Sequence, residues 1–254
     1  GAFCPTPVCD GKFIYAMLGN GLVACFDAEG NRQWLKFLDQ QMTLEHGRSA
    51  APLLTGGKLI LQLAYVVALD PKDGKLLWEV KDAECTYGTP AATKIGDVDI
   101  VIPPSGVVVR VSDGKILAKG IGTAMHTSPI VQDGIVYFIE VGVMAIQLPD
   151  KAGDGFKTKE LWSDGLEGET FASPVLHEGL IYSMNNSGVL RVLDAKTGKV
   201  VYTKETEIPV AGRTEKNANI YPSAALAGKY LYFSNDKGDT FVIEPGKEYK
   251  EIKR

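Results

Sequence analysis

The sequence predicts an all-β protein, a β-propeller made of four-stranded antiparallel blades, and three observations predict it. Turn-forming residues are spread along the whole chain, with 28 Gly and 13 Pro in 254 residues, which disfavours long helices. Short apolar runs rich in β-branched and aromatic residues lie between these turns. A motif of a small residue, a proline and an apolar residue recurs at intervals of about 43 residues, the length of a four-stranded propeller blade.

The recurring motif marks the start of each repeat. It reads Thr6-Pro7-Val8, Ala51-Pro52-Leu53, Thr89-Pro90-Ala91, Ser128-Pro129-Ile130 and Ser173-Pro174-Val175, with a degenerate sixth copy, Ser223-Ala224-Ala225. We expect one propeller domain over residues 1–254, with six visible blades at about 1–38, 45–82, 84–120, 123–164, 168–206 and 219–254.

Each repeat has the same internal order. A glycine turn follows the starting motif, two strands follow that turn, and an Asp-to-Gly turn then precedes a fourth strand that carries a large apolar residue. The aspartate can accept backbone N–H bonds in the turn, and the glycine supplies positive φ. We expect the large residue to dock over the gap to a neighbouring blade. The predicted docking residues are Trp34, Trp78, Trp162 and Tyr202, with the turn residues Asp70, Gly74, Asp194 and Gly198.

The second repeat, Ala68 to Trp78, resembles the tryptophan-docking motif Ala-x-Asp-x-x-x-Gly-x-x-x-Trp of the pyrroloquinoline-quinone-like (PQQ-like) repeat propellers. Only this copy matches fully; Trp34 comes one residue early, and Tyr202 replaces the tryptophan. The resemblance implies a ring of eight or seven blades, so we expect a fragment of a larger ring. A true six-bladed ring and completion by another chain are the alternatives. Blade faces left open in a fragment would be apolar and would favour self-association.

Composition and motifs exclude several function classes. A formal net charge of −4 lacks the basic footprint of a nucleic-acid binder. No apolar run approaches the roughly 20 residues of a membrane span. No nucleophile elbow, His-Glu-x-x-His pair or EF-hand loop occurs, so we assign no catalytic residue and no metal site.

The four cysteines match no zinc-binding spacing, and we interpret them as free thiols; they are Cys4, Cys9, Cys25 and Cys85. A Cys4–Cys9 or Cys9–Cys25 bridge is the alternative in an oxidising compartment.

The PQQ-like resemblance covers both enzymes and scaffolds. Its alcohol dehydrogenase branch has adjacent cysteines, a calcium ion held by Glu, Asn and Asp, and a tryptophan floor beneath the quinone. This sequence has no adjacent cysteines, and its three tryptophans all occupy docking positions. We therefore interpret the chain as a non-catalytic binding or scaffold propeller without a cofactor, similar to the lipoproteins that assist outer-membrane protein assembly. A dehydrogenase using PQQ and calcium, and a carbohydrate-binding propeller, are the alternatives.

The same resemblance implies an extracytoplasmic location, periplasmic or secreted. The expected partner is a protein, or a small or carbohydrate ligand.

Loops that enter the innermost strands gather at one mouth of a propeller channel, so they form the candidate binding site. The residues three positions before the proline of each starting motif, or before Ala224 in the sixth copy, are Cys4, Ser49, Tyr87, His126, Phe171 and Tyr221, with His46, Arg48 and Asn219 nearby. Aromatic rings with a few polar groups suit a peptide or a small ligand, and in the carbohydrate alternative Tyr87, Phe171 and Tyr221 would be stacking platforms. The alternative is that these side chains only fill the channel.

The long connection Thr206–Ile220 is a second candidate, because binding functions accumulate on loops of rigid scaffolds. Its alternative interpretation is a mobile surface loop.

Overall fold

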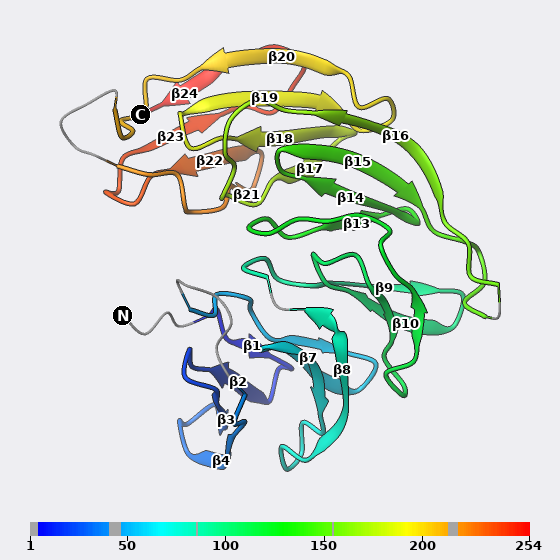
Figure 1. Ribbon diagram of the computed structural model, residues 1–254. Coiled ribbons are helices and arrows are strands. Elements are labelled where there is room, and N and C mark those ends of the chain that lie inside the picture. Colours follow the sequence, from blue (N-terminus) through cyan, green and yellow to red (C-terminus); the bar gives the residue numbers. More distant parts are fainter. Residues whose placement is uncertain (1–4, 41–46, 85, 154, 213–217) are drawn as a thin grey trace. The chain divides into compact units, whose positions relative to one another are not determined.

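The computed structural model describes residues 5–40, 47–84, 86–153, 155–212 and 218–254 (Figure 1). These residues form strands and turns and contain no helix. The strands make six four-stranded antiparallel sheets that follow one another along the chain, which confirms the all-β propeller with four-stranded blades. None of the described segments is a helix long and apolar enough to cross a membrane.

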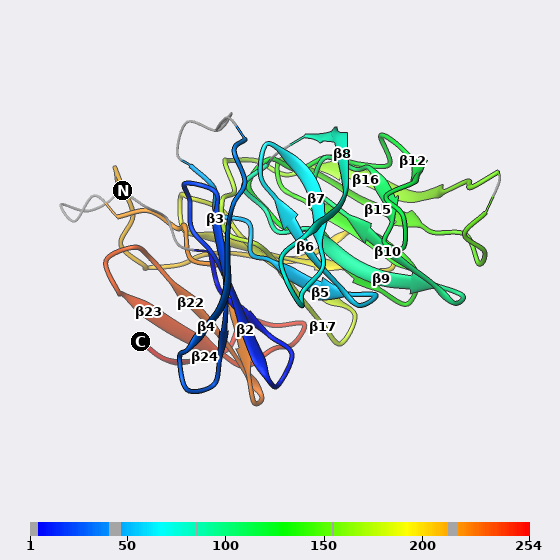
Figure 2. The same cartoon turned by 90° about the horizontal axis from the view of Figure 1, so that it is seen from below.

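In every sheet, strands that are consecutive in the chain are neighbours. The first blade comprises β1 (Val8–Cys9), β2 (Phe13–Met17), β3 (Leu22–Asp27) and β4 (Arg32–Phe37). The second comprises β5 (Leu53–Thr55), β6 (Lys58–Gln62), β7 (Tyr65–Leu69) and β8 (Leu76–Glu84), which lie side by side in Figure 2. The third comprises β9 (Ala91–Ile95), β10 (Val98–Ile102), β11 (Val108–Arg110) and β12 (Ile116–Ala118).

The fourth blade comprises β13 (Ile130–Gln132), β14 (Ile135–Ile139), β15 (Gly142–Gln147) and β16 (Lys159–Gly165). The fifth comprises β17 (Val175–His177), β18 (Leu180–Met184), β19 (Val189–Asp194) and β20 (Val200–Glu205). The sixth comprises β21 (Ala225–Ala227), β22 (Tyr230–Ser234), β23 (Thr240–Ile243) and β24 (Glu251–Lys253). The chain divides into two compact units: Gly1–Gly134 with Leu148–Thr158, and Ile135–Gln147 with Lys159–Arg254. Each unit is described separately below.

The second blade is apolar on both faces, because successive side chains of a strand point to opposite sides of the sheet. Leu59 and Leu61 of β6 belong to a buried cluster shared with the first blade. Ile60, between them, belongs to a second cluster shared with the third blade, together with Val66 and Ala68 of β7. The near-continuous apolar runs of β6 and β7 therefore follow from a sheet that is covered on both sides.

Each of the three tryptophans contacts the turn before the fourth strand of the next blade. The indole Nε1–H donates a hydrogen bond to a backbone carbonyl of that turn: Trp34 to Pro71 (2.9 Å), Trp78 to Val111 (2.9 Å) and Trp162 to Ala195 (3.0 Å). Each of these contacts thus buries a large ring and gives the indole N–H a hydrogen-bond partner. In these turns the Asp70 carboxylate accepts the Lys72 N–H, and the Asp194 carboxylate accepts the Thr197 N–H.

Glycine is required beneath each docked ring. Gly74, Gly114 and Gly198 all have positive φ, at +70°, +75° and +72°. A Cβ atom on these glycines would lie 2.8, 2.9 and 2.6 Å from the nearest atom of the ring above. The glycine of each Asp-to-Gly turn therefore has two roles. It adopts the positive φ of the turn, and its missing side chain leaves room for the neighbouring tryptophan ring.

Tyr202 occupies the docking position of the fifth blade but makes a different contact. Its ring packs edge-on against Tyr249, with ring centroids 6.5 Å apart and planes at 72°. Its hydroxyl is buried with no hydrogen-bond partner among the described residues, and burial raises the pKa of Tyr202. The backbone N–H of Gly246 in the following turn instead donates to the Tyr182 hydroxyl at 2.8 Å.

Both described cysteines are free thiols. Cys9 is exposed and Cys25 is buried, so the alternative of a Cys9–Cys25 bridge is wrong. The strand register also separates the two thiols. Cys9 on β1 lies opposite Ile14 of β2, whereas Cys25 on β3 lies opposite Tyr15 of β2. Cys4 and Cys85 lie outside the described residues.

Substituting the glycine beneath a docked ring should cost more than substituting a matched glycine in the same blade. Gly179 has nearly the same φ as Gly198 (+75° against +72°), but a Cβ on Gly179 would meet nothing within 4 Å. We expect Gly179→Ala to lower the free energy of unfolding by about 1 kcal/mol through backbone strain. Gly198→Ala should cost roughly 1–3 kcal/mol more, because the methyl group displaces Trp162. Urea unfolding of both variants measures the difference, and equal costs would contradict the docking role.

Candidate functional site

In the first unit, the loops that enter the third and fourth blades hold a stacked pair of rings. The centroids of Tyr87 and His126 are 5.3 Å apart, and their planes differ by 5°. The backbone N–H of Tyr87 donates to the carbonyl of Met125 at 2.7 Å, so the two loops are joined beside the rings. Met125 is 46% exposed. Ser49 from the second blade's loop joins the group, because its hydroxyl donates to the Tyr87 carbonyl at 2.8 Å.

The close approach of these loops has two causes. A Cβ atom at Gly88 would lie 2.2 Å from the carbonyl oxygen of Thr127, so only glycine lets the two backbones meet. The side chain of Gln62, fully buried at the end of β6, donates to the Thr86 carbonyl (2.8 Å) and the Gly88 carbonyl (3.2 Å). Buried hydrogen bonds of this kind are costly to break, so the backbone that carries Tyr87 is fixed from within the second blade.

The second unit repeats the arrangement with Phe171 and Tyr221. Their ring centroids are 5.5 Å apart and their planes are tilted by 37°. Tyr221 is 54% exposed. The backbone N–H of Ser173 donates to the hydroxyl of Ser223 at 3.1 Å, which joins the loops entering the fifth and sixth blades. The equivalent positions of two consecutive blades thus form an aromatic pair in each unit.

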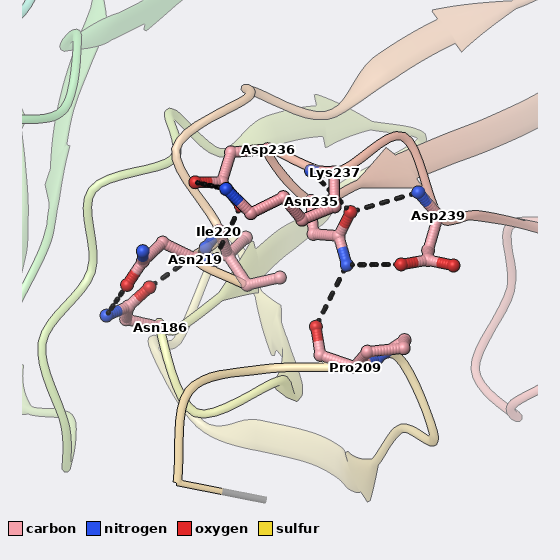
Figure 3. A network of polar contacts seen from close by, with 8 residues as sticks. All are labelled: Asn186, Pro209, Asn219, Ile220, Asn235, Asp236, Lys237 and Asp239. Carbon is pink, nitrogen blue, oxygen red and sulfur yellow. Dashed lines mark hydrogen bonds and ion pairs between the residues drawn. The ribbon is translucent and has the colours of Figure 1, made fainter. Parts of the chain in front are cut away.

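A network of amide side chains fixes the start of the long connection Thr206–Ile220 (Figure 3). The side-chain NH₂ of Asn235, at the turn after β22, donates to the Pro209 carbonyl and to the Asp239 carboxylate, each at 2.9 Å. Its Oδ1 accepts the backbone N–H groups of Lys237 and Asp239. One buried side chain therefore closes its own turn and also holds the connection.

The end of the connection is held in the same way (Figure 3). Asn219 and Asp236 exchange two bonds: the Asn219 N–H donates to the Asp236 carboxylate, and the Asp236 N–H donates to the Asn219 carbonyl, both at 2.9 Å. The Ile220 N–H donates to the side-chain oxygen of Asn186 at 2.9 Å. The bond from Asn219 is the main cause that lowers the pKa of Asp236 below its ordinary value.

The connection is part of the core at both ends. Ile208, Val210, Ala218 and Ile220 are at most 3% exposed, and the three larger side chains belong to the hydrophobic cluster of the fifth and sixth blades. The interpretation of the connection as a mobile surface loop is therefore wrong for these four buried residues. Residues 213–217 lie outside the described residues.

The remaining predicted site residues have different environments. Arg48 is only 2% exposed. Its guanidinium donates to the carbonyls of Gly19 (3.2 Å) and Gln40 (2.6 Å), so its hydrogen bonds are made within the first unit. Asn219 belongs to the network described above, and His46 lies outside the described residues. Sequence reasoning missed the amides that position the loops. The signal was present, because Gln62 ends the second strand of its blade and Asn235 follows the second strand of another.

The chain matches the family model for the outer membrane protein assembly factor BamB over residues 1–153 and 151–248. It belongs to the BamB family. Among solved structures it is similar to BamB from Moraxella catarrhalis (TM-score 0.68, 17% identity, 98% of this chain and 71% of that chain). It is also similar to the computationally designed protein Ika8 (TM-score 0.71, 13% identity, 96% of this chain and 71% of that chain). At these identities the likeness shows the fold alone. No curated protein matches the sequence.

The three tryptophans of this BamB-family chain are all engaged in contacts between blades. Each indole ring is seated on a turn glycine, and its N–H group is bonded to a carbonyl. The described residues also contain no cluster of three His, Cys, Asp or Glu side chains placed to hold a metal ion.

Acid should weaken the anchor of the long connection. Because the folded pKa of Asp236 lies below its ordinary value of about 3.9, its ionised form stabilises the fold above that pH. The contribution is lost as pH falls through the lowered folded pKa. We expect Asp236→Asn to reduce the free energy of unfolding at neutral pH and to cost less at about pH 3. Urea unfolding of both proteins at the two pH values measures this, and a pH-independent cost would contradict it.

Proposed function

We propose that this BamB-family chain is a non-catalytic scaffold propeller that binds a protein partner through the loops entering the first strands of its blades. The observation that carries the proposal is the pair of contacting rings in each unit, Tyr87 with His126 and Phe171 with Tyr221. Both pairs lie at equivalent positions of the repeat, and the side chains of Gln62 and Asn186 fix the loops beside them.

The chemistry of these loops favours a protein partner. Tyr221 and Met125 expose about half of their surface, and tyrosine and methionine are enriched at protein interfaces. An aromatic ring supplies a large contact area at a small entropic cost, because it has only two side-chain torsions. Since the loop backbone is already held by hydrogen bonds, little further ordering is needed when a partner binds.

The family supports the same proposal. The family is described as an outer membrane protein assembly factor, a role in which the partners are proteins. The same description supports an extracytoplasmic location associated with the outer membrane. The carbohydrate alternative has one specific observation in its favour: Tyr221 offers an exposed ring two residues from the amide of Asn219. Glycans therefore form the second arm of the test below.

Peptide and glycan arrays probed with the purified chain test the proposal. We expect binding to peptides that contain aromatic and apolar residues. Tyr221→Ala should weaken this binding by about tenfold or more, as loss of an interface hot spot does. The matched control is Leu77→Ala, which removes a 42% exposed side chain on β8 away from the loops and should leave binding unchanged. Binding to glycans without peptides would favour the carbohydrate alternative, and equal effects of the two variants would contradict the proposed site.

A second measurement, of Tm, tests whether the chain binds PQQ and calcium. A bound ligand at about 100 times its Kd adds roughly 2.7 kcal/mol of stability and raises Tm. Because all three indoles are already seated, we expect no shift in Tm with PQQ and calcium, added together or separately. A clear shift that requires both would contradict the scaffold proposal and favour the dehydrogenase alternative.

A further inference from the structure

A cavity of about 290 Å³ lies in the first unit, where turns of the second and third blades meet. Its lining comes from the β5–β6, β9–β10 and β11–β12 turns and the strand ends that adjoin them. Because β5 and β9 run from the entry loops to these turns, the cavity lies at the ends of the blades opposite the entry loops. It is therefore separate from the candidate site described above.

Five charged side chains line the cavity, and three of them are paired within the protein. Asp113 accepts the Arg110 Nε–H at 2.9 Å and a second bond from the Arg110 Nη2–H. These side-chain bonds are the main cause that lowers the pKa of Asp113 to about 2. The Asp99 carboxylate lies 3.6 Å from the ammonium group of Lys94.

Close packing between the two blades fixes the wall that carries Asp99. A Cβ atom on Gly56 would lie 3.2 Å from Asp99 Oδ2 and 2.9 Å from Val111 Cγ1, so the β5–β6 turn needs glycine at this point. Val111 is fully buried, and its carbonyl accepts the indole N–H of Trp78. The cavity is thus bounded by the docked junction of the second and third blades.

The other two charges are opposite in sign and are not paired. Among the described residues, no hydrogen bond or ion pair engages the ammonium of Lys58 or the carboxylate of Asp97, although both line the same cavity. The Ser112 side chain also lines it, and its hydroxyl has no hydrogen-bond partner in the described part of the chain. The cavity therefore offers a cationic donor, a carboxylate acceptor and a hydroxyl to a molecule that enters it.

We propose that this cavity binds a small zwitterion, a molecule with one ammonium and one carboxylate group such as a free amino acid. The carboxylate of the ligand binds Lys58 and accepts a hydrogen bond from Ser112, and its ammonium binds Asp97. The cavity volume is close to the lower limit of about 300 Å³ for small-molecule sites, which suits a ligand of this size. This inference goes beyond the proposed function and does not depend on it.

The mixed charge of the lining favours a ligand that carries both charges. A ligand with only a negative charge would be repelled by the carboxylates of Asp97 and Asp99 when it bound Lys58. A ligand with only a positive charge would be repelled by Lys58 and Arg110 when it bound Asp97. A zwitterion places each of its charges beside an opposite one, so both unpaired charges of the cavity gain a partner.

Nitrogen-15 NMR titration of the whole chain at constant ionic strength tests the proposal. The probes are glycine, β-alanine and γ-aminobutyrate, which carry the two charges at increasing separation, and butyrate and butylammonium, which carry one charge each. We expect the backbone amide signals of Gly56, Asp97 and Ser112 to shift with at least one zwitterion. That zwitterion should reach half-saturation at a concentration about tenfold lower than either singly charged probe, because it makes one more charge-assisted hydrogen bond.

Two variants test the roles of the unpaired charges. Lys58→Met and Asp97→Asn each remove one charge with little change of shape, and neither side chain is buried, so both variants should fold. Each should raise the half-saturating concentration of the best zwitterion by about tenfold. Lys75→Met and Asp73→Asn, at exposed positions between β7 and β8 of the same unit and outside the cavity, are the matched controls and should leave that concentration unchanged.

Three outcomes would overturn the proposal. No shift of these amide signals with any of the three zwitterions at millimolar concentrations would show that the cavity binds none of them. A response to butyrate or butylammonium at the same concentration as to the best zwitterion would show that a single charge is recognised. Equal weakening by the control variants would show that the zwitterion binds elsewhere on the surface.

Discussion

The structure depends on the seating of an indole ring on a glycine of the next blade. A four-stranded sheet that is apolar on both faces cannot be stable alone, and its neighbour must cover it at a fixed distance. The docked tryptophan sets that distance, because its N–H reaches a carbonyl of the neighbouring turn while its ring rests where a Cβ would otherwise be. At these three junctions, one contact therefore determines both the blade spacing and the turn geometry.

The aromatic pairs of the candidate binding surface lie at other junctions, where no indole is docked. There the entry loops are joined directly, because the Tyr87 N–H donates to the Met125 carbonyl and the Ser173 N–H donates to the Ser223 hydroxyl. Buried amides such as Gln62 and Asn235 then fix the loop backbones. At these junctions, bridged loops and fixed backbones position the exposed rings.

The blade repeat could be predicted from the sequence because its causes are local. Proline and glycine determine the turns, and alternation within short apolar runs determines the strands. The same spacing predicts the docking positions of the tryptophans. The burial of Arg48 and of the long connection could not be predicted in this way. Arg48 bonds to carbonyls 29 and 8 residues away, and a guanidinium or an apolar Ile208 looks the same in sequence whether it lies on a surface or in a core. Tyr202 also shows this limit, since its edge-on contact depends on Tyr249.

Hydrogen exchange of the three indole N–H groups tests the docking contact most directly. Nitrogen-15 NMR resolves the Nε1–H signals of Trp34, Trp78 and Trp162 separately, with assignment by single Trp→Phe variants. If each indole is bonded to a carbonyl in a covered seat, all three should exchange far more slowly than a solvent-exposed indole, because exchange then requires the blades to separate. Exchange of all three at the rate of free indole would contradict the account, since the rings would then not hold neighbouring blades together.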